Sequence, residues 1–417
     1  MKEWKNLSEN PRRALVNAFG FGGINANILL EEFKPKYHHE LIENFKQDIP
    51  NSVVARKYAV ISYGYFDEES SKGDFVFPFI KFKIPPLISN KLDEAQRMGL
   101  LGVSNALERE EINIPKEKTG VFVGSIFGLK NAYFSDLRIR SVEYTAILKE
   151  ILGDTLSDKE YQDLEEEFKS NFDTVEEDTL PGYMDNIIAG RIANHYDTQG
   201  INATYDMDIG SFVAALHQGL MSLNNNDNDL IIVGAVNCND MDEFYQIYKE
   251  AGSSGCKVRK GACFFIVKRE EDVQPSDKVY AYITEPKFNK TSVKKNQNNE
   301  MDYMGATEAF VLLEKIIMYN EQKKSIKHTS ATLSGRSFTY DIIPECCKDS
   351  IVDQDKYFTF YTKDTDLSVI IQSLENIYSK KEILQSDIKE KSQVAIVFRD
   401  YEELADQIDF LKKINKI

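Results

Sequence analysis

Cysteine is scarce in this sequence, and its absence from paired positions argues against several kinds of site. The five cysteines among the 417 residues include no C-x-x-C pair, which is the usual signature of a structural zinc site or a redox-active dithiol. Five cysteines are also too few for a disulfide framework. Cys346 and Cys347 are adjacent, which is only a weak redox hint. We therefore expect reduced, mostly buried cysteines, no metal site and no cofactor.

Long apolar runs are missing as well. No stretch approaches the roughly 18 consecutive apolar residues of a membrane-spanning helix, and residues 1–5 lack the apolar core of a signal peptide. These absences predict a cytoplasmic protein. The formal net charge of −16 disfavours anionic partners, because an acidic surface repels nucleic acid, anionic membranes and acidic carrier proteins. We expect neither nucleic acid nor membrane as a partner.

Hydrophobic residues are present in the ordinary proportion for a folded protein, at 42% of the chain. Residues 12–33 have the pattern of a strand, a glycine loop and a second strand. Residues 34–54 are polar and charged without apolar periodicity, which predicts a linker. Residues 357–417 predict a separate small unit of two strands, each followed by an amphipathic helix.

Between these ends, strands alternate with helices, which predicts a mixed or parallel sheet layered with helices. The strands are expected at 57–63, 119–124, 201–208, 230–236, 261–268 and 279–283. The helices are expected at 93–108, 184–196, 211–223 and 305–319. Between roughly 130 and 180 lies an acidic helical insertion, whose charges are most simply a solvated helix face.

Several of these segments, in this order, resemble ketosynthases. The segments that match the ketosynthase succession in order and character are 119–124, 189–193, 206–217, 230–236 and 261–269. The likeness covers most of residues 56–345, and residues 357–417 resemble the linker subdomain that follows ketosynthases in polyketide synthases. It implies an α/β fold of thiolase type, with α/β/α/β/α layers and a small α/β linker subdomain at the C-terminus.

The front of the chain resembles the C-terminal end of a ketosynthase. The loop that carries this likeness is formed by Gly20, Phe21, Gly22, Gly23 and Asn25. Asn27 stands where histidine is more usual. The resemblance implies that an active ketosynthase precedes this domain. An alternative is that residues 12–33 complete the central domain as a permuted strand pair, although residues 331–345 already supply a degenerate strand, turn and strand there.

The predicted domain organisation follows from these likenesses. Residues 1–33 are the C-terminal tail of a preceding ketosynthase, and residues 34–54 are a linker. Residues 55–345 are a degenerate ketosynthase domain. Residues 346–417 are the α/β subdomain that follows it.

The catalytic positions of a ketosynthase are replaced in this sequence. Ketosynthases carry D-T-A-C-S-S at a sharp strand-to-helix turn, where the helix N-terminus favours the cysteine thiolate. Aligning that motif places Asp206 at the aspartate, Asp208 at the alanine and Ile209 at the cysteine. Isoleucine cannot form a thioester. Of the two family histidines, one belongs to an H-G-T-G-T loop that is absent, and the best match for the other is Tyr303.

The five histidines of the chain suggest no substitute. His38 and His39 lie in the linker, and His328 follows the last core helix. His195 and His217 lie on helices, where we expect them to be packed residues rather than catalytic ones. Asp206 and Asp208 are an alternative acid/base pair, because side chains two apart on a strand share a face.

The likeness narrows to chain length factor domains, which follow the ketosynthase in polyunsaturated fatty acid synthases and related iterative synthases. The runs that carry it are 83–87 leading into 92–96, 180–194 and 233–237. It implies a catalytically silent partner that pairs with an active ketosynthase, as a heterodimer or within one polypeptide. The pairing strand would be 201–208, and acyl carrier protein would be met only indirectly.

In this role the domain bounds the partner's acyl tunnel. The candidates for tunnel lining or interface contact are Tyr133, Phe134, Tyr205, Met207, Asp208 and Phe212. Plain core packing is the alternative for each. A purely architectural scaffold shares the same fold and interface. An acyl decarboxylase or transferase with altered chemistry, using Asp208 or Tyr303, would need a pocket that reaches those groups and a strongly perturbed ionisation state.

Overall fold

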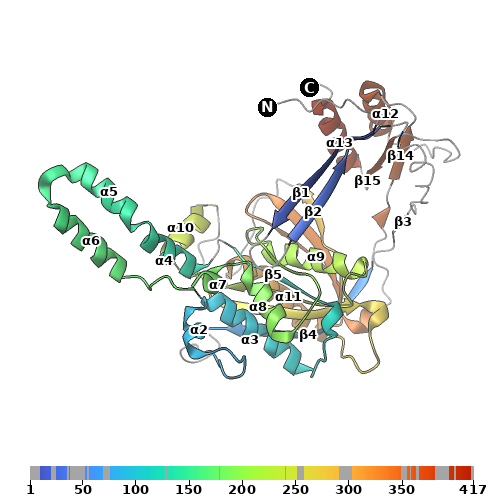
Figure 1. Cartoon of the computed structure of the whole chain (residues 1–417). Coiled ribbons are helices and arrows are strands. Elements are labelled where there is room, and N and C mark those ends of the chain that lie inside the picture. The colour runs from blue at the N-terminus through green and yellow to red at the C-terminus, as the bar shows by residue number, and fades with distance from the viewer. Residues whose placement is uncertain are drawn as a thin grey trace. The chain divides into compact units, whose positions relative to one another are not determined.

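The computed structural model divides the chain into two compact units, residues 56–350 and residues 1–55 with 351–417 (Figure 1). The described residues are 10–19, 25–34, 37, 52–53, 56–68, 76–126, 129–177, 179–239, 241–250, 258–290, 303–348, 355–356, 358–362, 366–380, 394–398 and 401–414. The expected glycine loop and most of the expected linker therefore lie outside the described residues.

The larger unit is built on a mixed sheet. Its strands are β4 (Lys57–Asp67), β5 (Thr119–Gly124), β6 (Asn202–Tyr205), β7 (Leu230–Asn237), β8 (Gly261–Arg269), β9 (Ala281–Thr284), β10 (Lys287–Lys290), β11 (Ile326–Ala331) and β12 (Arg336–Ile343). They are ordered β10-β12-β9-β4-β8-β7-β5-β6, and β11 pairs with β12. β5 is parallel to β6 and β7, and the other pairings are antiparallel.

Helices cover both faces of this sheet. Those of the larger unit are α2 (Pro86–Lys91), α3 (Glu94–Arg109), α4 (Lys130–Ile139), α5 (Ser141–Leu152), α6 (Asp158–Ser170), α7 (Thr179–Tyr183), α8 (Ile187–Tyr196), α9 (Ser211–Asn224), α10 (Asp242–Glu250) and α11 (Thr307–Gln322). Neighbouring residues of β8 show the layering, because Phe265 packs on Phe212 of α9 and Phe264 packs beside Gly102 of α3. β8 is buried on both faces, which explains its continuous apolar run.

The acidic insertion forms the helices α4, α5 and α6, as expected. Residues 130–178 carry six basic and fourteen acidic side chains, a net charge of −8 and half of the chain's −16. α6 begins with a capping box between Ser157 and Glu160. Tyr161 closes the α5–α6 hairpin by donating its hydroxyl to the carbonyl oxygen of Gly153.

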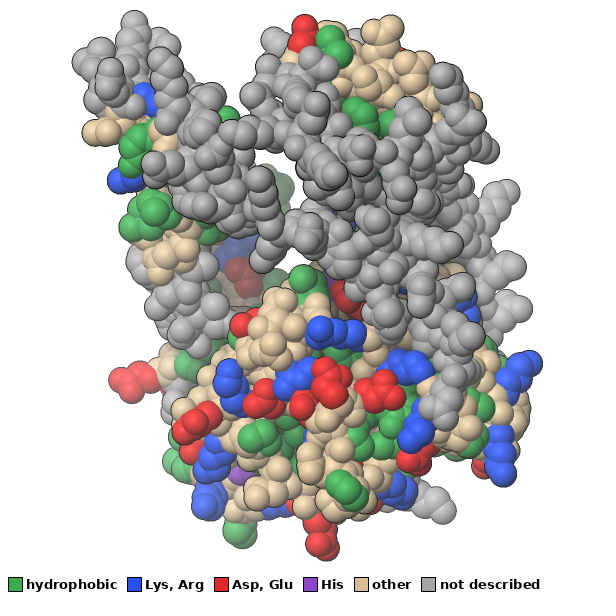
Figure 2. Space-filling model, turned by 90° about the vertical axis from the view of Figure 1, so that its right-hand side faces the viewer, with side chains coloured by type: hydrophobic (Ala, Val, Ile, Leu, Met, Phe, Trp, Pro, Cys, Tyr) green, Lys and Arg blue, Asp and Glu red, His purple; other side chains and the backbone are tan. Residues whose placement is uncertain are grey.

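Positive and negative side chains are interspersed on the face of the larger unit that Figure 2 shows, so the acidic excess forms no single patch there. Among the residues described, none belongs to a helix both long and apolar enough to cross a lipid bilayer. Cys238 and Cys263 are buried, whereas Cys346 is exposed.

The smaller unit contains a hairpin and a small α/β core. The hairpin pairs β1 (Arg13–Phe19) with β2 (Asn25–Glu31), and the short β3 (Ser52–Val53) pairs with β13 (Asp355–Lys356). The elements of the α/β core are β14 (Phe358–Thr362), α12 (Leu367–Lys380), β15 (Val394–Phe398) and α13 (Tyr401–Ile414). They bury Leu374, Phe398 and Leu404 between them.

The strand and helix pattern predicted from the sequence agrees with this architecture, apart from some boundaries and short elements. β6 ends at Tyr205 rather than at residue 208, because the chain turns there. The final strand, turn and strand expected at 331–345 begins at Ile326, since β11 pairs along β12. The short elements α2, α10 and β10 were not predicted.

Gly64 of β4 is a position at which packing leaves no room for a side chain. A Cβ atom there would lie 2.1 Å from the backbone nitrogen of Ala106 in α3. We expect Gly64→Ala to lower the free energy of unfolding by about 2–3 kcal/mol, because the strand and helix backbones must separate. Gly190→Ala in α8 is the matched control, with its nearest neighbour at 3.8 Å, and should be neutral or stabilising by up to about 1 kcal/mol. Urea unfolding measures both, and equal stabilities would contradict this packing.

Candidate functional site

The chain makes a sharp turn between β6 and α9, at residues 206–210, which we call the elbow. Asp208 has φ of 47°, in the left-handed region that aspartate tolerates better than most residues. The hydroxyl of Ser211 accepts a hydrogen bond from the Met207 amide at 2.9 Å and donates to the Asp208 carbonyl at 2.6 Å. A Cβ atom on Gly210 would lie 2.8 Å from the methyl carbons of Met207 and Thr332. The elbow is therefore tightly packed.

The carboxylate of Asp208 joins the elbow to the turn between β11 and β12. Its two oxygens accept hydrogen bonds from the backbone amides of Leu333 at 3.1 Å and Ser334 at 3.0 Å. The carboxylate of Asp206 accepts from the Asp208 amide at 3.2 Å. Because β6 has already ended, the two carboxylates do not share a strand face, which corrects that expectation. Both accept hydrogen bonds from backbone amides that shape the turn.

Ile209 is the residue that the motif predicts at the position of the ketosynthase cysteine. Its side chain is 1% exposed and packs against Ile126, which follows β5, and against Met304. The partly buried residues around this trio are Phe244, Val258 and Leu333. Side chains of these types carry no nucleophilic or titratable group, so this cluster, the Ile209 cluster, supplies apolar contact and no covalent or proton-transfer chemistry.

Tyr303, the expected match for a family histidine, does not face Ile209. Its ring stacks on Phe310 at 3.9 Å within the main core, and burial raises the pKa of its hydroxyl to about 12. The next residue, Met304, has φ of 47° and turns its side chain to Ile209 instead. Sequence alignment missed Met304 because nothing in the sequence indicates that this methionine has a left-handed backbone conformation.

The proposed tunnel residues do not share one environment. Tyr133 contacts Phe244, with ring centroids 6.1 Å apart, and so reaches the Ile209 cluster through it. Phe134 lines a separate cavity of about 270 Å³ with Phe172. The remaining candidates are placed as follows: Tyr205 half-buried on Phe122, Met207 half-buried at the elbow, and Phe212 fully buried against Phe265. For Phe212 the structure has the core packing that was the alternative.

The described histidines are packed away from the Ile209 cluster. His328 of β11 is 5% exposed and contacts the Glu308 carboxylate at 2.8 Å, while the Lys315 ammonium meets its other ring nitrogen. These contacts tie β11 to α11. His217 faces Glu285 at 3.3 Å, and His195 packs on Phe82. Burial lowers the pKa of both His195 and His217.

A carboxyl group that the sequence did not single out lies near the elbow. Asp185 precedes α8, and its carboxylate bonds to Ser125 at the end of β5. Its backbone carbonyl accepts from the hydroxyl of Thr204 in β6 at 3.3 Å. Burial, with Asp206 and Asp93 nearby, raises the pKa of Asp185 to about 6. No sequence motif marks Asp185, because its raised pKa results from its burial in the folded chain.

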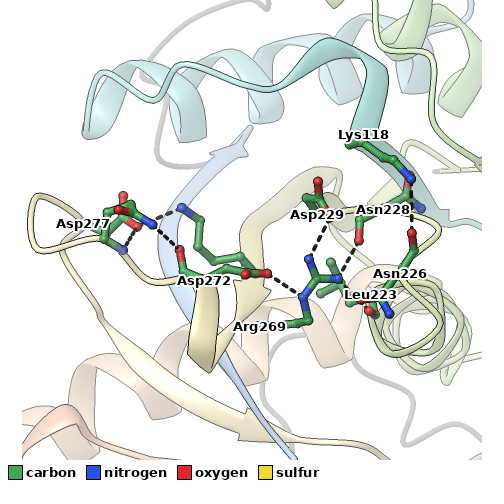
Figure 3. A network of polar contacts seen from close by, with 10 residues as sticks. Lys118, Leu223, Asn226, Asn228, Asp229, Arg269, Asp272 and Asp277 are labelled. Atoms are coloured by element: carbon green, nitrogen blue, oxygen red, sulfur yellow. Dashed lines mark hydrogen bonds and ion pairs between the residues drawn. The ribbon is translucent and has the colours of Figure 1, made fainter.

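A second cavity, of about 710 Å³, lies at the other end of the strands, beside the start of β7 and the end of β8. Arg269 at its wall donates to the carbonyl oxygens of Leu223 at 2.7 Å and Asn228 at 2.9 Å, and to the carboxylate of Asp229 at 2.7 Å (Figure 3). These contacts tie β8 to the connection between α9 and β7. Among the described residues, no group of His, Cys, Asp and Glu is placed to hold a metal ion.

Comparison with known proteins places this geometry in context. Residues 67–255 match the family described as "Beta-ketoacyl synthase, N-terminal domain". The chain is similar to one component of the polyunsaturated fatty acid synthase of Thraustochytrium sp., with 25% identity over 210 residues, which are 46% of this chain and 7% of that protein. The chain thus corresponds to a small part of that relative. The predicted resemblance to ketosynthases is confirmed.

Two solved structures share the fold. The PfaC keto synthase-chain length factor has a TM-score of 0.63 and 14% identity, over 80% of this chain and 47% of that one. A type II polyketide synthase ketosynthase, AntDE, in complex with its acyl carrier protein AntF, has a TM-score of 0.50 and 11% identity, over 69% of this chain and 99% of that one. The predicted α/β fold of thiolase type is confirmed.

The raised pKa of Asp185 predicts a pH-dependent stability. An unfolded aspartate titrates near pH 4, so ionisation destabilises the folded state increasingly as pH rises from about 4 to about 6. Asp185→Asn should therefore raise the Tm at pH 8 relative to wild type and leave it nearly unchanged at pH 4. Asp163→Asn, on the exposed face of α6, is the control. A difference that is the same at every pH would contradict the assignment.

Proposed function

We propose that this chain, whose fold is that of the ketosynthases, is the catalytically silent partner of an active ketosynthase and bounds that partner's acyl tunnel. The observation that carries the proposal is the Ile209 cluster. A condensing enzyme needs a nucleophile at the end of β6 and a base beside it. Here Ile209 stands at the elbow after β6, and the side chains packed around it are apolar, which favours a packing role.

An exposed sheet edge supports the pairing. β6 lies at the end of the sheet, and its outer edge pairs with no other strand in the part of the chain that the structure describes. All four of its residues are half-buried, and Ile201 before it is 45% exposed. Unpaired backbone amides and carbonyls on such an edge favour the addition of another strand. We infer that the equivalent strand of the ketosynthase pairs there.

The same edge leads to the candidate tunnel residues. Tyr205 is the last residue of β6, and Met207 follows it at the elbow. Tyr133 joins them by way of Phe244 and the Ile209 cluster. An acyl chain that grows toward the paired edge would meet these side chains, and their bulk would set its maximum length. We therefore propose Tyr133, Tyr205 and Met207 as the determinants of tunnel depth.

Direct docking of the acyl carrier protein is more favourable on the proposed ketosynthase partner than on this chain. The net charge is −16, and half of it lies on residues 130–178. Acyl carrier proteins are themselves acidic, so their direct docking here is electrostatically unfavourable. We propose that the carrier protein approaches through the ketosynthase.

Two other functions remain as alternatives. A purely architectural scaffold would use the same fold and the same β6 edge, so only a measurement of product length separates it from chain-length control. An acyl decarboxylase or transferase built on Asp208 or Tyr303 receives little support. The Asp208 carboxylate is already bonded to two backbone amides, and the Tyr303 hydroxyl has a pKa of about 12.

Catalytic silence is tested by acyl transfer. The purified chain is incubated with an acyl thioester donor beside an active ketosynthase, and both are followed by intact mass. We expect a stoichiometric acyl adduct on the ketosynthase and none on this chain, because Ile209 has no group that can form a thioester. Ile209→Cys, which restores the nucleophilic atom alone, is an informative comparison. An adduct on the wild-type chain would refute its silence.

Chain-length control is tested by truncating the side chains of the proposed tunnel residues. Met207→Ala and Tyr133→Ala should shift the products of a reconstituted synthase toward longer chains, by at least one two-carbon unit, because each deepens the tunnel. Leu164→Ala, on the exposed side of α6, is the control and should leave chain length unchanged. Product lengths are read by mass spectrometry. An unchanged distribution with an intact complex would leave the scaffold as the function.

A further inference from the structure

The chain contains two hairpins with one register. In the larger unit, β11 and β12 pair from Ile326↔Ile342 to Ala331↔Ser337. In the smaller unit, β1 and β2 form the first hairpin of the chain, which begins with the pair Arg13↔Glu31 and continues from Ala14↔Leu30 to Phe19↔Asn25. Adding 312 to the residue numbers of the pairs from Ala14↔Leu30 to Phe19↔Asn25 gives all the pairs of the second hairpin, β11–β12. The same offset aligns Gly23 in sequence with Gly335 of the turn between β11 and β12. The two hairpins are therefore structural equivalents.

Equivalent positions differ sharply in burial. In the second hairpin, Tyr340 and Ile342 are each 1% exposed and form part of the main core. Their counterparts in the first hairpin, Ile28 and Leu30, are 56% and 54% exposed. Val16, which lies directly opposite Ile28, is 49% exposed. The first hairpin thus presents to solvent the apolar face that the second one buries.

The other face of the first hairpin is apolar as well. Leu15 and Leu29 lie opposite each other and are both well exposed. Their counterparts in the second hairpin are the polar pair Lys327 and Asp341. Among the described residues, the small core around Leu374 includes none from the hairpin. An isolated two-stranded hairpin is marginal in water, and the exposed apolar face of Val16, Ile28 and Leu30 requires cover.

The chain's own sheet has no vacancy for this hairpin, because β11 and β12 already occupy the equivalent place beside β9 and β10. We propose that β1 and β2 form the closing hairpin of a second ketosynthase-fold domain and insert into its sheet as β11 and β12 do here. The occupant of the face that carries Val16, Ile28 and Leu30 is thus the body of that domain. The inference rests on the proposed function, since the second domain is the active ketosynthase of the pair.

Hydrogen–deuterium exchange of the full chain tests this inference, alone and with the ketosynthase of the same synthase, the one that carries an intact cysteine elbow. In the chain alone, peptides within 13–31 should exchange fast, as an exposed hairpin does. In the complex their exchange should slow by about tenfold or more. Continued fast exchange in a formed complex would overturn the inference. Protection that arises without ketosynthase as the chain is concentrated would point to a second copy instead, and would overturn it too.

Two matched variants sharpen the test. Ile28→Asp places a charge on the face that the partner would bury and should weaken the complex at least about tenfold. Asn17→Asp places the same charge at the counterpart of the exposed Thr329 and should bind like wild type. Because both positions are exposed in the chain alone, both variants should keep the wild-type Tm. Equal binding of the two would contradict insertion.

The outcome pattern separates this inference from the proposed function. A complex whose hairpin stays unprotected refutes insertion and leaves chain-length control standing. A protected hairpin combined with unchanged product length in the Met207→Ala complex supports insertion and refutes length control. Failure of the ketosynthase to bind the chain at all would refute both.

Discussion

The contact between the Asp208 carboxylate and the backbone amides of Leu333 and Ser334 is the constraint on which the site depends. It joins the elbow after β6 to the turn between β11 and β12. On the far side of that hairpin, His328 and Glu308 tie β11 to α11. The elbow, the last hairpin and the helix that begins beside Met304 are therefore fixed by one set of polar contacts, and the Ile209 cluster is what they enclose.

This arrangement explains how the elbow of a ketosynthase-type fold is packed tightly around an apolar residue. A nucleophile at the elbow must remain reachable and is therefore only partly packed, whereas Ile209 adds buried apolar surface at the same point, and such surface stabilises a fold by about 25 cal/mol per Å². Asp208 and Asp206 retain polar character at the elbow, but their oxygens are used by backbone amides. The polar groups that remain serve the turn.

Much of the fold could be predicted from the sequence, because its main elements have strong periodic signals. The apolar run of β8 and the helical spacing of α3 are clear examples. The place of Ile209 at the elbow was also readable from the motif. The partner of Ile209 was not, since Met304 faces it by way of a left-handed backbone that leaves no trace in composition. The burial of single side chains could not be predicted from the sequence either, as Phe212 and Asp185 show. The sequence already showed that residues 12–33 and 331–345 could fill the same place, but not that they share one register, because only Gly23 and Gly335 coincide between residues 20–24 and 332–336.

The exposed leucines of the β1–β2 hairpin bear on how such a protein would have to be produced. An orphan protein that displays an apolar two-stranded ribbon, together with the open edge of β6, offers the surfaces through which unassembled chains aggregate. The same surfaces attract holdase chaperones, which draw material away from the folded pool. Under the proposed pairing, cover of these surfaces by the ketosynthase would protect the chain from both fates.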